Sequence, residues 1–96
     1  MKQYRAMYGR YHVSIIDEYD DFGEAVSALQ WGGEMGELYA YAIYDSRSEA
    51  FHVPADSELL QANTDRQKAI LREKLGLSPE GAFTIAGHFD RHPPDI

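Results

Sequence analysis

Two segments of the sequence have apolar residues at helical spacing, and each lies between segments of alternating hydrophobicity. In the first, positions 22, 25, 26 and 29 are apolar, which is the i, i+3, i+4, i+7 pattern of a helix with one buried face. Asp21 and Glu24 form a capping-box arrangement at its start. The pair Gly32-Gly33 is expected to end it, because glycine readily adopts the left-handed conformation that follows a helix.

The second helical segment begins after Thr64, which forms another capping-box arrangement with Gln67. Its apolar side consists of Ile70, Leu71 and Leu75. Gly76 has the position of a glycine that follows the helix. Residues 55–63 allow two interpretations, a short helix capped by Ser57 or an irregular segment before the new start at residues 63–65.

The segments around these helices predict strands. Residues 11–17 alternate apolar and polar side chains, as a half-buried strand does. Residues 38–45 and 49–54 predict a hairpin with a turn at residues 45–48, and residues 82–89 predict the last strand. Residues 3–8 either extend the first strand or form a separate short one.

The predicted order is β-α-β-β-α-β, and the commonest closed arrangement of that order is ferredoxin-like. We therefore expect an α+β fold of two layers: an antiparallel sheet in the order 4-1-3-2 with both helices on one face. A wrong last strand, or a helix at residues 56–62, would leave a simpler two-layer sheet. Residues 1–96 are expected to be a single domain with its core at about residues 10–90 and a mobile tail at 91–96.

The sequence contains no cysteine. This excludes disulfides, thiolate nucleophiles and thiolate metal sites, and it fits a reducing compartment. No apolar run approaches the roughly 20 residues that cross a bilayer, and the first residues lack the apolar stretch of a signal peptide. We therefore expect a cytoplasmic protein that does not bind membranes.

The net charge of −7 is distributed unevenly. Between Arg10 and Arg47 there is no Lys or Arg. The carboxylates of that interval are Asp17, Glu18, Asp20, Asp21, Glu24, Glu34, Glu37 and Asp45. Such a surface repels phosphate backbones, so direct nucleic-acid binding is not expected, and a basic protein partner is favoured.

Within that interval, Asp20, Asp21 and Glu24 are the candidate partner-binding carboxylates. The alternative is that they complement the helix dipole and add solubility. Trp31, at the end of the first helix, is expected to fill the core, and the alternative is an anchor for a partner.

Two tyrosines on the predicted second strand, Tyr39 and Tyr41, alternate with Ala40 and Ala42. If the helices cover the alanines, the tyrosines lie on an open sheet face, where a homodimer, a partner protein or a small ligand would bind. If the helices cover the tyrosines instead, they belong to the core. The periodicity does not distinguish these two arrangements.

Three histidines converge in the predicted sheet order. His12 begins strand one, and His52 and His88 lie near the ends of its two antiparallel neighbours. Three imidazoles with an open position suit Zn²⁺ or another divalent transition metal. A one-residue change of register would move a histidine to the other face, so the main expectation is that no cofactor is present.

The glycines at positions 32, 33 and 36 end a helix instead of opening one after a strand, so they form neither a P-loop nor a dinucleotide fingerprint. No nucleophile elbow or HExxH motif is present. The sequence therefore favours a dimeric, non-catalytic interaction or regulatory module, of the kind common among accessory proteins of bacteria and phages. The alternatives are a metal-binding protein or small enzyme that uses the histidines, and a ligand-sensing domain.

Overall fold

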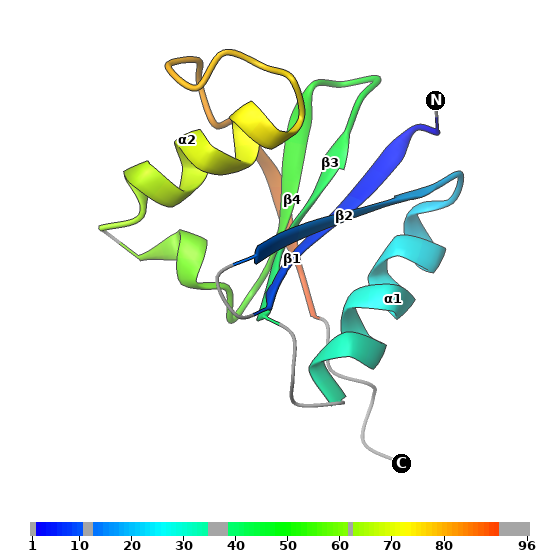
Figure 1. Cartoon of the computed structure of the whole chain (residues 1–96). Helices are drawn as coiled ribbons and strands as arrows, with labels where there is room; N and C mark the ends of the chain where they lie inside the picture. The colour runs from blue at the N-terminus through cyan, green and yellow to red at the C-terminus, as the bar shows by residue number, and fades with distance from the viewer. Residues whose placement is uncertain (1, 11–12, 35–38, 62, 91–96) are drawn as a thin grey trace.

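The computed structural model describes residues 2–10, 13–34, 39–61 and 63–90, with the backbone alone at 10, 13–14, 31–34 and 58. In these described residues the chain is a small α+β protein with one five-stranded mixed sheet, two α-helices and a short 3-10 helix (Figure 1). The elements in chain order are β1 (Tyr4–Arg10), β2 (Val13–Tyr19), α1 (Phe22–Glu34), β3 (Tyr39–Asp45), β4 (Ala50–Pro54), η1 (Glu58–Leu60), α2 (Asp65–Lys74) and β5 (Ile85–Phe89).

The strands lie in the order β2-β1-β3-β4-β5. β1 is antiparallel to both β2 and β3, and β3 is antiparallel to β4. β5 is parallel to β4. A parallel neighbour requires a crossover connection, because the chain must return to the end of the sheet at which β4 began. The segment that contains α2 supplies this crossover.

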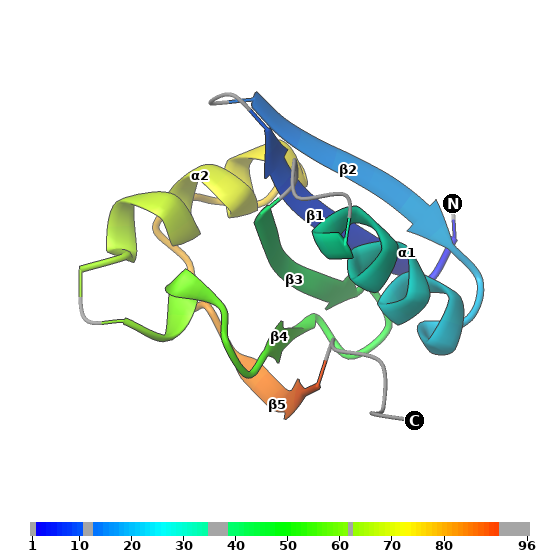
Figure 2. The ribbon, with the colours of Figure 1, turned by 90° about the horizontal axis from the view of Figure 1, so that it is seen from below.

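The two helices cover opposite faces of the sheet (Figure 2). On one face, α1 packs through Ala25 and Leu29 against a cluster that includes Ala6 of β1. On the other, α2 packs through Leu71 against a cluster that includes Met7 and Phe51. Successive residues of a strand point to opposite faces, so β1 supplies both cores.

The predicted ferredoxin-like fold is therefore wrong in its sheet order, its antiparallel pairing and its helices on one face. Residues 4–10 form a separate strand, which takes the position between β2 and β3. Ala6, Met7 and Tyr8 are consecutive and all buried, because helices cover both sides of β1. Such a strand has no alternating pattern, and a search for alternation does not find it.

The start of α1 agrees with the prediction, and its end does not. The Asp21 carboxylate accepts a hydrogen bond from the backbone N–H of Glu24, at 3.2 Å, as an N-cap residue does. The helix continues past Gly32-Gly33 to Glu34. Glycine permits a helix end without requiring one, and it costs only about 1 kcal/mol per residue in a helix interior.

At α2 the end of the helix agrees with the prediction, and its start does not. Gly76 has φ of +79°, and its N–H and that of Leu77 bond to the carbonyls of Glu73 and Arg72, both at 2.9 Å. This is the Schellman motif expected at that end. The predicted cap at the start is wrong, because the Thr64 side chain makes no capping hydrogen bond.

The segment before α2 contains the short helix that was one of the two interpretations. The Ser57 hydroxyl accepts from the N–H of Leu59 at 3.2 Å and donates to the Tyr41 carbonyl at 3.0 Å. Thr64 turns its hydroxyl toward the Leu59 and Gln61 carbonyls. These contacts fix η1 against the sheet.

Candidate functional site

With a helix on each face, the outer sides of β2 and β5 are the parts of the sheet that no described strand covers. The two edge strands differ in chemistry. β2 carries Asp17 and Glu18, whereas β5 (IAGHF) has no Asp, Glu, Lys or Arg. The candidate binding surfaces therefore lie at the two ends of the sheet.

The acidic surface consists of Asp17, Glu18, Asp20, Asp21 and Glu24, and all five residues are exposed. It follows β2 to its end and continues into the first turn of α1. Two cations from the N-terminal region reach it. Lys2 lies 4.0 Å from Asp20, and the Arg5 Nε lies 3.4 Å from a Glu18 carboxylate oxygen.

Some of these carboxylates have structural partners. Asp21 caps α1, and Asp17 accepts a hydrogen bond from the Tyr8 hydroxyl. The side chains of Lys2 and Asp20 are 53% and 77% exposed, and an ion pair in such a setting contributes about 0–1 kcal/mol. A cation from another protein can therefore replace Lys2 at little cost.

The acidic surface affects the pKa of Tyr19. Burial raises the pKa of its hydroxyl above the ordinary 10.0, and the charges of Asp17 and Glu24 raise the pKa further. A negative neighbour acts in this direction because it disfavours the phenolate. Carboxylates from both β2 and α1 thus contribute to the negative potential at the Tyr19 hydroxyl.

The two alanines that were predicted to share a face of β3 lie on opposite faces of the sheet. Met7 pairs with Ala42 and Tyr8 with Ala40, so Tyr41 is an extra residue in β3 at a β-bulge. As a result, Ala42 faces the α2 core and Ala40 the α1 core. The expectation that both alanines lie on one face is wrong, because alternation breaks at a bulge.

Tyr41 is partly buried against the α2 core, whereas Tyr39 is 64% exposed. Trp31 lies in the last part of α1, and its side chain is outside the described residues. Partner binding by these three residues stays a prediction.

The three histidines are not brought together by the described part of the chain. His12 lies outside it. His52 pairs with Gly87 and packs edge-on against Phe22 of α1, at 4.8 Å between ring centroids. His88 pairs with Val53, whose side chain belongs to the core on the α2 face. Because alternate residues point to opposite faces, His52 and His88 project to different sides.

No group of three metal-ligating side chains occurs among the described residues. The argument for convergence assumed the sheet order 4-1-3-2, which the structure does not have. A metal site formed by His12, His52 and His88 stays a prediction.

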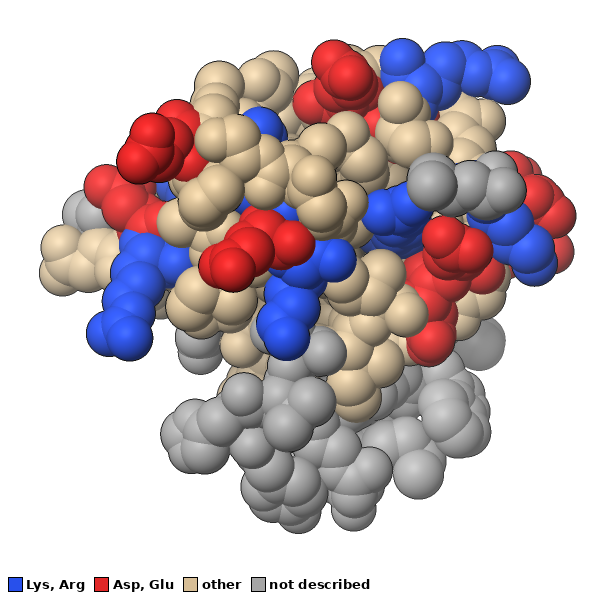
Figure 3. Space-filling view, turned by 45° about the horizontal axis from the view of Figure 1, so that its top comes forward, with Lys and Arg blue, Asp and Glu red and all other residues tan. Residues whose placement is uncertain are grey.

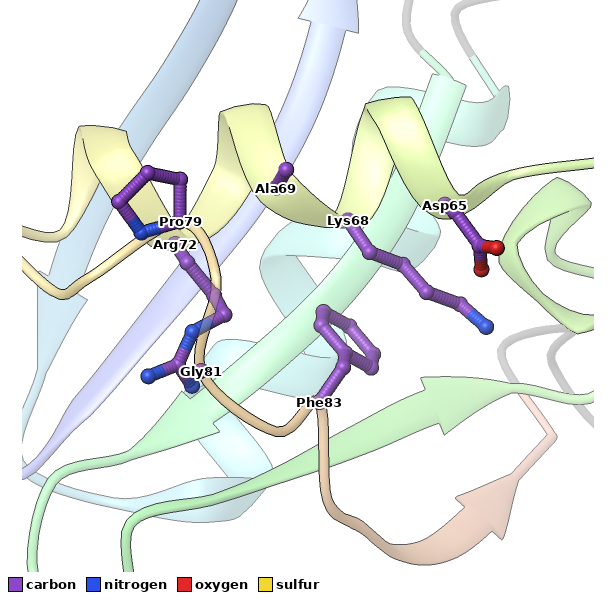
Figure 4. Close-up of a pocket in the computed structure, with 7 residues that line it drawn as sticks. All are labelled: Asp65, Lys68, Ala69, Arg72, Pro79, Gly81 and Phe83. Atoms are coloured by element: carbon purple, nitrogen blue, oxygen red, sulfur yellow. The ribbon is translucent and has the colours of Figure 1, made fainter.

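A shallow pocket of about 260 Å³ lies between α2 and the segment that precedes β5 (Figure 4). Lys68 and Arg72 extend from α2 on either side of Phe83. The Lys68 Nζ lies 5.6 Å from the centre of the Phe83 ring, and that ring stacks on Phe51 at 3.9 Å. Phe83 thus has a cation and an aromatic ring as neighbours and contributes to packing.

Arg72 holds the loop that closes this pocket. Its Nε donates to the Ser78 carbonyl at 2.7 Å and its Nη1 to the Ala82 carbonyl at 2.6 Å. Arg72 is a basic residue in the last turn of α2, so by sequence alone it is a charge that complements the helix dipole. Its link to a loop six to ten residues away has no sequence signal, because it depends on how the loop folds back.

Charges of both signs are mixed on the side that includes the top of Figure 1. Figure 3 shows Lys and Arg side chains beside Asp and Glu side chains there, without an extended patch of one sign. On this side, the negative net charge of the chain is therefore not gathered into one patch.

The uncharged edge of β5 is a feature that sequence reasoning missed. The signal was present, since residues 82–89 contain no charged residue and no proline. The predicted order 4-1-3-2 also places the last strand at an edge, but the uncharged composition of that strand was not interpreted as a binding surface.

None of the helices in the described ranges is long and apolar enough to span a bilayer. A scan of protein-family models gives no match to the chain, and neither the curated proteins nor the solved structures contain a significant match. The functional conclusions therefore depend on the geometry of this chain.

Proposed function

We propose that the chain is a non-catalytic protein-interaction module whose acidic surface binds a basic surface of another protein. The observation that supports this function is the position of five exposed carboxylates within residues 17–24, at the open edge of the sheet and the start of α1. Only Lys2 and Arg5 form ion pairs with them among the described residues.

The chemistry of the acidic surface favours proteins over other partners. Nucleic acids and anionic membranes carry the same sign of charge and are repelled. A basic protein surface is attracted over a distance of about one Debye length, roughly 8 Å at physiological salt. Attraction of this kind accelerates association more than it lengthens the life of the complex.

The lack of cysteine supports a cytoplasmic setting for the protein, and cell fractionation tests this.

Charge reversal tests the proposal. The double variant Asp20→Lys and Glu24→Lys reverses two exposed positions and leaves the Asp21 cap intact. The immobilised protein is exposed to an extract of its own cells at 50 and 300 mM salt. We expect the wild type to capture a basic protein at low salt and the double variant to lose it. Higher salt should weaken capture by the wild type as well.

The matched control is Glu73→Lys and Glu80→Lys, which changes the net charge by the same amount at exposed positions outside the acidic surface. We expect it to capture as the wild type does. Both double variants are first compared with the wild type in a thermal melt. Equal loss in both, or capture of no basic protein by the wild type, would contradict the proposal.

A further inference from the structure

The outer edge of β5 has unused pairing capacity. The carbonyls of Thr84 and Phe89 accept hydrogen bonds from the N–H groups of Phe51 and Ala55 on the β4 side, at 2.8 and 2.9 Å. The backbone groups of neighbouring residues in a strand point to opposite edges, so those of Ile85 and His88 point outward. β5 is the last strand in the sheet order.

Two features of this edge limit edge-to-edge pairing, its length of five residues and a register shift against β4, but protective charge is missing from it. Natural edge strands are also protected by charged side chains and prolines. β2 has Asp17 and Glu18 for this purpose, but residues 82–89 have no charged residue and no proline. Ile85 is 37% exposed, and Ala86 and His88 are also exposed. An edge of this composition is suited to pairing with another strand.

We propose that two copies of this chain pair through β5 in antiparallel orientation, around a twofold axis that extends the sheet across both molecules. A strand edge is complementary to itself in this arrangement, because each copy offers the same outward N–H and C=O groups. This inference does not depend on the acidic surface, which lies at the other end of the sheet order.

The distribution of charge favours a second copy of the chain as the partner of β5. It also favours β5 over β2 as the strand through which two copies pair. Each copy has a net charge of −7, so two copies approach with least repulsion where neither has charge. Pairing through β2 would instead bring two acidic surfaces together. A basic partner has no carboxylate to bind on β5.

The contact is small. Two strands of five residues bury less area than the roughly 1,600 Å² of a standard stable interface. The dimer is therefore expected to form and dissociate with concentration. Because added salt screens repulsion between like charges, it should strengthen the dimer, whereas it weakens binding of a basic partner.

Sedimentation at several concentrations in 50 and 500 mM salt tests the pairing. We expect a dimer that increases with concentration and with salt. Ala86→Lys places a charge on the edge in each copy and should weaken association at least tenfold. Gln61→Lys adds the same charge at an exposed position outside β5 and should leave association unchanged. The acidic-surface variant Asp20→Lys and Glu24→Lys should still dimerise.

Hydrogen exchange locates the interface without substitution. In concentrated wild-type protein, the amides of Ile85 and His88 should exchange more slowly than in dilute protein, and the Ser14 amide of β2 should not change. A wild type that stays monomeric at every concentration and salt would overturn the proposal. So would a folded Ala86→Lys variant that dimerises normally, or slowing confined to β2.

Discussion

Arg72 connects an α-helix to an irregular loop through two separate nitrogen atoms. The Nε and Nη1 donors lie on one planar guanidinium, so the two accepting carbonyls, of Ser78 and Ala82, must have one relative orientation. The loop between them leads directly into β5. A single side chain thus helps to set where the last strand of the sheet begins.

Replacing Arg72 by alanine should therefore destabilise the protein. Both hydrogen bonds are exposed to water, which replaces them in part, so we expect a loss of about 1–2 kcal/mol in the free energy of unfolding. Arg72→Lys should recover little of this, because an ammonium group cannot donate along both directions. Urea unfolding measures the effect, with Arg66→Ala at an exposed site of the same helix as control. Equal stability of Arg72→Ala and Arg66→Ala would show that the loop does not need the guanidinium.

The ends of α2 show how one element combines local and tertiary control. Its C-terminal end is local, since Gly76 adopts a left-handed conformation and two hydrogen bonds close within the six residues 72–77. Its N-terminal end depends on η1, because the Thr64 hydroxyl bonds to carbonyls of the preceding segment instead of capping the helix. The local feature is the one that the sequence predicts correctly.

A pair of glycine substitutions separates backbone conformation from packing. A Cβ at Gly76 or at Gly87 would have no heavy atom within 4 Å, but only Gly76 has a positive φ. We expect Gly76→Ala to lower the free energy of unfolding by about 1–2 kcal/mol. Gly87→Ala should be neutral or slightly stabilising, because alanine restricts the unfolded chain. Thermal and urea melts test this, and a similar loss in both variants would contradict the conformational explanation.

The elements that sequence reasoning predicted well are those defined by short-range chemistry: the Asp21 cap, the hairpin of β3 and β4, and the Gly76 end of α2. Long-range pairing could not be predicted in the same way. β1 has no alternation because both of its faces are buried, and the bulge at Tyr41 puts Ala40 and Ala42 on opposite faces. Of the candidate site, the acidic residues were identified directly, since exposed charge is visible in a sequence.

At the scale of the whole molecule, the sheet order decides which distant residues can meet. Because β1 lies between β2 and β3, the strand that follows His12 is not a neighbour of β4 or β5, as the predicted sheet order required. Placing β5 parallel to β4 sets His52 and His88 one register position apart with their side chains on different faces. A site that requires three particular strands to be neighbours therefore depends on topology more than on residue type.

The metal hypothesis has a direct test in a thermal melt. Chelator-treated protein is heated with and without Zn²⁺, Ni²⁺, Cu²⁺ or Mn²⁺. Since His52 and His88 project to different faces, we expect the melting temperature to stay unchanged. Binding at a hundredfold excess over Kd would add about 2.7 kcal/mol, or roughly 10 °C for a domain of this size. A rise of that kind that disappears in His52→Ala and in His88→Ala would establish the site and reverse our expectation.

Because α1 and α2 cover opposite faces, the charges of the two helices are separated across the sheet. α1 carries two carboxylates and no Lys or Arg, whereas α2 carries four cations and two carboxylates. The two helices therefore contribute an electric dipole through the thickness of the sheet, in addition to the net charge of the chain. In the field of a positively charged surface, this contribution applies a torque that turns α1 toward the surface before contact, which increases the share of collisions that meet in a productive orientation.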